Sequence, residues 1–189
     1  MLPLSISWRT ADKLVYGPNY ATGSVQTGDT HLGVVTWHET SSPLEVTLRN
    51  TSQDRQTVLG LANPGESLKN IRLYLTGDAA TIHVLMVEWP PLGCGVELSM
   101  DQGASWILFS GVSVTLPDGT VLPVAGYDAD PTSWIPLRGS SVSSTAGDGE
   151  LLPYPPYDQA SLLLRVQTPS ASSQKGLFQY EIGLDFDVF

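Results

Sequence analysis

The chain has 189 residues, which is enough for one domain of ordinary size with a substantial core. Its net charge is −10 and its nine basic residues are scattered, so the composition excludes the basic stripe with which nucleic-acid-binding proteins contact phosphates. A hydrophobic content of 41% with 18 glycines and 14 prolines is typical of many short strands joined by turns.

Residues 1–40 are the least regular part of the sequence. They are rich in Gly, Thr and Ser and contain Trp8 and Trp37. We predict that they form either an extended N-terminal arm or a first hairpin, separate from a main domain at 41–189. Residues 1–7 lack the basic and apolar regions of a signal peptide, and no apolar run is long enough to span a membrane. We therefore expect synthesis in a cytoplasm.

Alternation of apolar and polar residues dominates the rest of the chain. It occurs in residues 44–48, 71–75, 82–86, 96–100, 162–166 and 178–188. This period of two predicts strands that bury one face and expose the other. Pro117-Asp118-Gly119, between Val112 and Val124, predicts a hairpin turn. No segment combines helical spacing of apolar residues with a credible cap, so we predict no long helix.

Residues 139–150 are polar and rich in Gly and Ser, which predicts a mobile loop. The predicted order is therefore an arm followed by a series of strands. The fold class that follows is all-β: an immunoglobulin-like or jelly-roll antiparallel β-sandwich with an extended N-terminal arm.

The most specific local motif lies at residues 99–106 and has the pattern Ser-x-Asp-x-Gly-x-Ser-Trp, which matches the Asp box of sialidases and other propellers. Asp101 is placed to accept backbone N–H groups, Gly103 allows positive φ, and Trp106 is placed to pack under the turn that follows Ser99. We interpret the motif as a structural hairpin. A marker of carbohydrate binding is the alternative.

Five tryptophans are candidates for stacking on sugars or for anchoring a protein interface. Trp134 follows the loop-like segment Asp130-Pro131-Thr132-Ser133 and is the first candidate for a ligand-facing aromatic residue. Packing within the domain is the alternative for each tryptophan.

The sequence contains no recognisable catalytic or metal-binding motif. His31, His38 and His83 are not clustered, and Cys94 is the single cysteine. There is no P-loop, dinucleotide-binding motif or nucleophile elbow. We expect no catalytic residue, no metal and no cofactor, although an enzyme whose site no motif reveals stays open as an alternative.

Acidic residues gather in the second half of the chain. From residue 90 onward there are eleven acidic and three basic residues, against eight and six in the first 89. This half is expected to repel nucleic acid and anionic membranes and to favour either solubility or a basic partner. Asp185 and Asp187 share one strand face, which we interpret as a solvated polar face rather than a cation site.

Five segments resemble small β-sandwich proteins of tailed-phage virions, which are found in baseplates, at tail tips or as capsid decoration. They are residues 44–50, 71–77, 96–106, 162–169 and 176–187. The resemblance covers roughly residues 43–189. It implies a structural subunit with no catalytic residue to carry over.

The resemblance also implies partners and a location. The expected partners are other virion proteins and copies of the chain itself, and the expected location is a virion assembled in the host cytoplasm. Tail or baseplate association is the favoured position, with the arm adding a strand to a neighbour's sheet. The alternative function is a carbohydrate-binding or adhesin module that uses exposed tryptophans.

Overall fold

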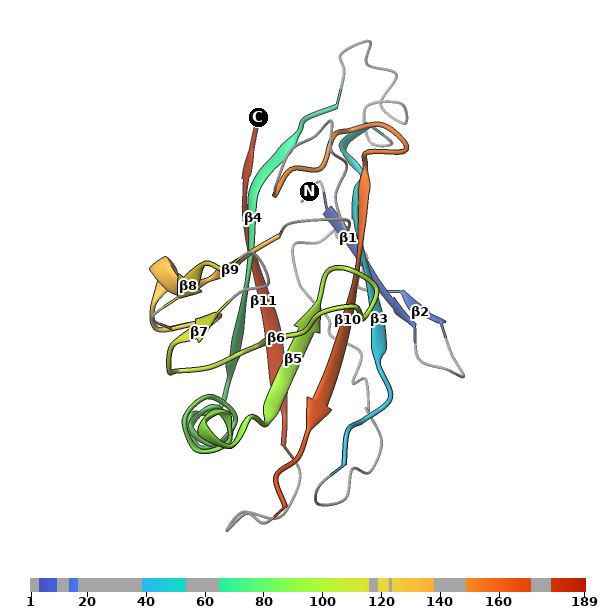
Figure 1. Ribbon diagram of the computed structural model, residues 1–189. Helices are drawn as coiled ribbons and strands as arrows, with labels where there is room; N and C mark the ends of the chain where they lie inside the picture. Colours follow the sequence, from blue (N-terminus) through green and yellow to red (C-terminus); the bar gives the residue numbers. More distant parts are fainter. Residues whose placement is uncertain are drawn as a thin grey trace.

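Two antiparallel sheets face one another in the computed structural model, which describes residues 4–9, 14–16, 39–53, 65–115, 119–122, 124–137, 149–170 and 178–189 (Figure 1). Sheet A has the strand order β2-β1-β3-β10-β5-β6, and sheet B has the order β11-β4-β9. The strands of sheet A are β1 (Leu4–Arg9), β2 (Leu14–Tyr16), β3 (Leu44–Asn50), β5 (Gly95–Ser99), β6 (Ile107–Leu108) and β10 (Gln159–Gln167). Those of sheet B are β4 (Leu68–Gly77), β9 (Ile135–Pro136) and β11 (Tyr180–Val188). The predicted all-β antiparallel sandwich is confirmed.

The alternating segments lie in the sheets as predicted, with one exception. β3, β4, β5, β10 and β11 correspond to five of the six segments, although β5 ends one residue before its segment and β11 begins two residues after the start of its own. Pro117-Asp118-Gly119 separates β7 (Val114–Thr115) from β8 (Val121–Leu122), which pair as an antiparallel hairpin. Residues 116–118 themselves lie outside the described residues.

The exception is residues 82–86, where the predicted strand is wrong. The chain forms a continuous helical segment instead: α2 (Ala79–His83), the π-helix η2 (Val84–Glu88) and the 3₁₀-helix η3 (Pro90–Leu92). The Asp78 side chain accepts hydrogen bonds from the N–H groups of Ala80 and Thr81, so Asp78 caps the start of this helical segment.

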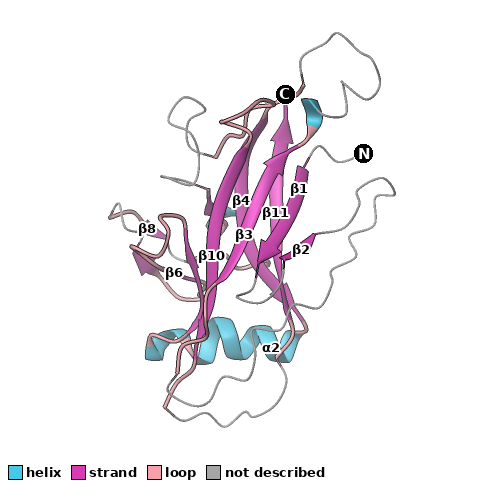
Figure 2. Ribbon diagram, turned by 90° about the vertical axis from the view of Figure 1, so that its right-hand side faces the viewer, coloured by secondary structure: helices cyan, strands magenta, loops and turns pink. Residues whose placement is uncertain are grey.

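Helical spacing explains how the segment packs. Ile82, Leu85, Met86 and Trp89 follow the i, i+3, i+4, i+7 pattern, and all four are buried. Val84 is buried as well, so the apolar residues satisfy both a strand and a helix period. The segment lies across one end of the sandwich (Figure 2).

A β-bulge in β4 interrupts the ladder with β11. Arg72 pairs with Asp185 and Lys69 with Asp187, so Asn70 and Ile71 both lie opposite one residue of β11. Asn70 has a φ of 54°, in the left-handed region. The extra residue resets the alternation, so Leu68 and Ile71, three positions apart, are both fully buried.

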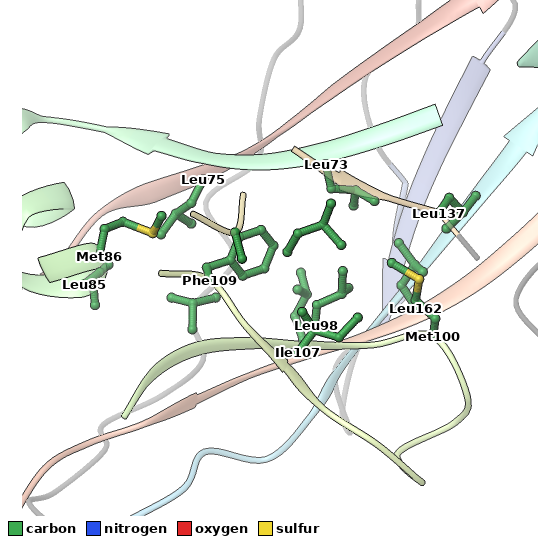
Figure 3. Packing of buried hydrophobic residues seen from close by; sticks show 14 of the residues in the cluster. Leu73, Leu75, Leu85, Met86, Leu98, Met100, Ile107, Phe109, Leu137 and Leu162 are labelled. Atoms are coloured by element: carbon green, nitrogen blue, oxygen red, sulfur yellow. The ribbon is translucent and has the colours of Figure 1, made fainter. Parts of the chain in front are cut away.

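The core lies between the sheets and extends to the helical segment (Figure 3). Leu73 and Leu75 from sheet B face Leu98, Ile107 and other residues of sheet A, with Phe109 at 0% exposure near the centre. Truncating such a buried aromatic residue to alanine costs about 3–5 kcal/mol in other proteins. The core therefore holds the two outer faces in fixed positions.

The described part of the N-terminal segment, residues 4–9 and 14–16, lies in sheet A. β1 and β2 form a hairpin, and β1 pairs with β3 over six residue pairs. The hairpin thus extends the chain's own sheet across the boundary placed at residue 40. Residues 10–13 and 17–38, and residues 139–148 of the predicted loop, lie outside the described residues. Gly149, at the end of that loop, is buried and accepts a hydrogen bond from Ile71 N.

Candidate functional site

The Asp-box segment closes the hairpin between β5 and β6. Gly103 N donates to Ser99 Oγ (2.8 Å), and Ser105 N donates to Asp101 Oδ1 (2.8 Å). The Ser105 hydroxyl donates to the other carboxylate oxygen, and Gly103 has a φ of 90°. Hydrogen bonds from the Ser105 side chain, and then from its backbone, lower the pKa of Asp101. The motif's polar groups thus serve the turn itself.

Trp106 is covered by a charged pair on the outer face of sheet A. The Arg165 guanidinium carbon lies 3.8 Å from the centre of the indole ring, and Arg165 Nε lies 2.6 Å from Glu97 Oε2. The two charged side chains are only 25% and 13% exposed. This cation–π contact and ion pair give Trp106 a packing role.

Trp134 lies on the opposite side of the sandwich, between the 3₁₀-helix η4 (Pro131–Ser133) and β9. Its ring stacks on Tyr74 at a centroid distance of 4.4 Å and an interplanar angle of 21°. Its Nε1–H donates to the carbonyl of Tyr127 (3.2 Å). The aromatic residue singled out in the sequence is therefore half-buried and held by a ring on β4 and by a backbone carbonyl outside the named strands.

Tyr74 joins this stack to β11. Gly183 lies opposite Tyr74 in the ladder, and a Cβ at Gly183 would lie 2.1 Å from the tyrosine ring. Glycine is needed there because the ring covers the backbone of the neighbouring strand. Tyr74, Trp134 and Gly183 form what we call the aromatic stack.

Charged groups border the aromatic stack. Arg72 lies 5.4 Å from the Trp134 ring centre and forms a close ion pair with Asp185. Burial, followed by the negative charges of Asp128, Asp185 and Glu181, raises the pKa of Tyr74. A surface hollow of about 330 Å³ includes Arg72, Pro136 and Asp187 in its lining, but none of the three residues of the stack. An aromatic ring with flanking hydrogen-bonding groups is the composition of many sugar-binding surfaces.

The edge of β11 is the second candidate site. β4 pairs with one side of β11, and no strand among the described residues pairs with the other side, which we call the open edge. Phe189 and Ser67 exchange both backbone hydrogen bonds, which fixes the alternation along the strand. Ile182, Leu184 and Phe186 therefore direct their N–H and C=O groups to the open edge.

Of the residues considered for metal or nucleophilic chemistry, the structure describes His83 and Cys94. His83 is exposed and lies 3.6 Å from Glu88, whereas His31 and His38 lie outside the described residues. Cys94 is buried, and that burial, followed by the charge of Glu97, raises the pKa of its thiol. In the described part of the chain no three His, Cys, Asp or Glu side chains form a group that could hold a metal ion.

A buried polar cluster near the start of β10 is structural. Asn50 Nδ2 donates to the carbonyls of Glu66 (2.8 Å) and Leu151 (3.0 Å), and its Oδ1 accepts from Ser52 N. Asp158, whose side chain is 6% exposed, forms an ion pair with Arg49 at 3.0 Å. These bonds connect three separate segments of the chain. They engage the Asn50 amide and the Asp158 carboxylate within the fold, so we assign these two side chains no ligand.

Sequence reasoning missed the partners of Trp134 and the open edge. One signal was present: Gly183 interrupts an otherwise regular strand, and an isolated glycine in a strand often marks a close approach. The identity of the covering ring depends on which strands become neighbours, and this is set by contacts far apart in the sequence.

No family model matches the chain, and no curated protein or solved structure shows significant similarity to it. None of the helices that the structure describes is long and apolar enough to cross a membrane.

Proposed function

We propose that the chain is a non-enzymatic structural subunit that acts through protein–protein interfaces, as part of the tail or baseplate of a tailed bacteriophage. The observation that carries this proposal is the open edge of β11. β11 is nine residues long, and one of its sides meets no strand in the described ranges, so it is a ready template for pairing with another chain.

Side-chain exposure along β11 supports the proposal. Tyr180, Ile182, Leu184 and Phe186 pack against the core but are only partly buried. Beyond them, Val188 is 46% and Phe189 67% exposed. A strand added at the open edge would cover this apolar row, which favours association with another protein over isolation in water.

Mass spectrometry of virus particles tests the proposal. Tailed particles purified by density gradient from the source organism are expected to contain the chain at a fixed ratio to a major tail protein. The ratio should persist through a high-salt wash, because a structural subunit is not adsorbed by charge alone. Particles that lack the chain, with the chain recovered only in the soluble cell fraction, would contradict the assignment.

Glycan binding at Trp134 is the second candidate function. The half-buried ring with Arg72, Asp185 and Asp128 nearby supports it. On a glycan array, Trp134→Ala is expected to abolish any binding shown by the native chain. Trp106→Ala, on the other face, is the matched control. An array without signal, or equal losses in the two variants, would argue against this function.

A further inference from the structure

The outer face of β11 carries an acidic row beside the open edge. Glu181, Asp185 and Asp187 alternate with the apolar residues that face the core. Residues at alternate positions of a strand point to the same side, so the three carboxyl groups lie along one face. The fourth position in this row is Gly183, which Tyr74 covers.

Neighbouring cations neutralise only part of this row. Arg72 pairs with Asp185, and Lys69 pairs with Glu150 at 3.5 Å. Asp187 accepts a hydrogen bond from the neutral amide of Asn70 at 2.6 Å. Among the described residues no cation lies within ion-pair distance of Glu181 or Asp187, and both are exposed. In the described part of the chain, Glu181 and Asp187 therefore form no ion pair, and Lys69, which lies opposite Asp187 in the ladder, pairs with Glu150 instead.

The inner face next to the same edge has the opposite character. Its residues are apolar and partly buried: Tyr180, Ile182, Leu184 and Phe186. An added strand would place every second side chain against this row and the others beside the acidic row. The edge therefore selects an alternating sequence, with apolar residues facing inward and basic residues facing outward.

We infer that the open edge of β11 binds an extended segment of another protein in which Lys or Arg alternates with apolar residues. This inference rests on the proposed function, because it names the chemistry of the partner that the assembly interface accepts. A second copy of the chain is a poor fit, since each copy carries a net charge of −10 and would bring further carboxylates to the acidic row.

The probe is an acetylated and amidated peptide, Lys-Val-Lys-Ile-Lys-Val-Lys-Ile. The control is the same peptide with Glu in place of each Lys. Binding to the full chain is measured by fluorescence anisotropy at low and at physiological salt. The Lys peptide is expected to bind and to weaken as salt rises, whereas the Glu peptide is expected not to bind. Equal binding of both peptides would overturn the charge assignment.

Two variants that change the net charge equally at different places on the molecule locate the binding site of the peptide. Glu181→Lys with Asp187→Lys is expected to weaken binding of the Lys peptide at least tenfold. Glu45→Lys with Gln159→Lys and Ser161→Lys changes the net charge equally at exposed positions of sheet A and is expected to keep most of the affinity. Equal losses in the two variants would show attraction to net charge only, and would overturn the inference.

Backbone protection provides a readout that folding defects do not imitate. Bound Lys peptide is expected to slow hydrogen exchange at Ile182, Leu184 and Phe186, and to leave Gly183 and Asp185 unchanged, because those two already face β4. Protection elsewhere, or a dimer of the chain formed through β11 in light scattering, would overturn the inference. If particles contain the chain but these tests fail, the assembly role stands and only the partner chemistry is rejected.

Discussion

Each outer face of the sandwich carries a tryptophan, an arginine and a carboxylate, but the two sets differ in how deeply they are buried. On sheet A, Trp106 lies under Arg165, which pairs with Glu97, and on sheet B, Trp134 lies near Arg72, which pairs with Asp185. Each tryptophan directly precedes a strand of two residues, β6 or β9.

The difference between the two faces lies in burial. The Arg165 and Glu97 side chains are 25% and 13% exposed, whereas those of Arg72 and Asp185 are 38% and 41% exposed. Arg165 and Glu97 lie on β10 and β5, which have a neighbour on both sides, while Asp185 lies on β11 at the edge of its sheet. Position in the sheet, rather than residue type, decides which of the two pairs is buried and which is exposed.

Replacing each arginine in turn is expected to give the largest difference in stability between the two faces. Arg165→Ala leaves Glu97 half-buried without its partner and uncovers Trp106, so we expect a loss of about 2–3 kcal/mol in the free energy of unfolding. Arg72→Ala removes a more exposed pair and is expected to cost under about 1 kcal/mol. Urea denaturation measures both values. Equal losses would show that the two faces are equally closed.

Gly183→Val tests whether the aromatic stack depends on β11. A side chain at this position would displace the Tyr74 ring and separate it from Trp134. We expect a loss of about 1–3 kcal/mol in thermal or urea unfolding, as for other overpacked sites. Ser161→Val, at an exposed position of β10 in sheet A, is the matched control with an expected change within about 0.5 kcal/mol. A stable Gly183→Val variant with unchanged tryptophan fluorescence would contradict the stacking account.

Asp101→Ala has a smaller, pH-dependent effect on the hairpin at the edge of sheet A. We expect a loss of about 1 kcal/mol at neutral pH, because Ser99 and Ser105 lose an acceptor. The native pKa of Asp101 is lowered, so its stabilisation is complete above the ordinary carboxyl pKa and disappears as pH falls through the native value. The stability difference from the native chain should therefore shrink on acidification. A difference independent of pH would contradict the role of the carboxylate.

The sequence predicts the strands well because alternation is a local signal. Residues 178–188 show this best, since the apolar row found in β11 is readable position by position. The hairpin at residues 99–106 was also readable, because Ser99, Asp101 and Gly103 act on their own turn.

Residues 82–86 show where prediction from the local pattern of apolar residues fails. Ile82, Val84 and Met86 fit a strand, while Leu85 and Trp89 complete a helical pattern with Ile82. Asp78 resolves the ambiguity because its side chain caps the first turn. The partners of Trp134 required knowledge of strand order, which no local pattern supplies.

The most direct test of assembly through β11 is residue-resolved hydrogen exchange on the isolated chain and on the chain in purified particles. The account predicts that the N–H groups of Ile182, Leu184 and Phe186 exchange rapidly in the isolated chain and slowly in the particle, while Gly183 and Asp185 are protected in both. Equal exchange of the three open-edge amides in the two samples would contradict it.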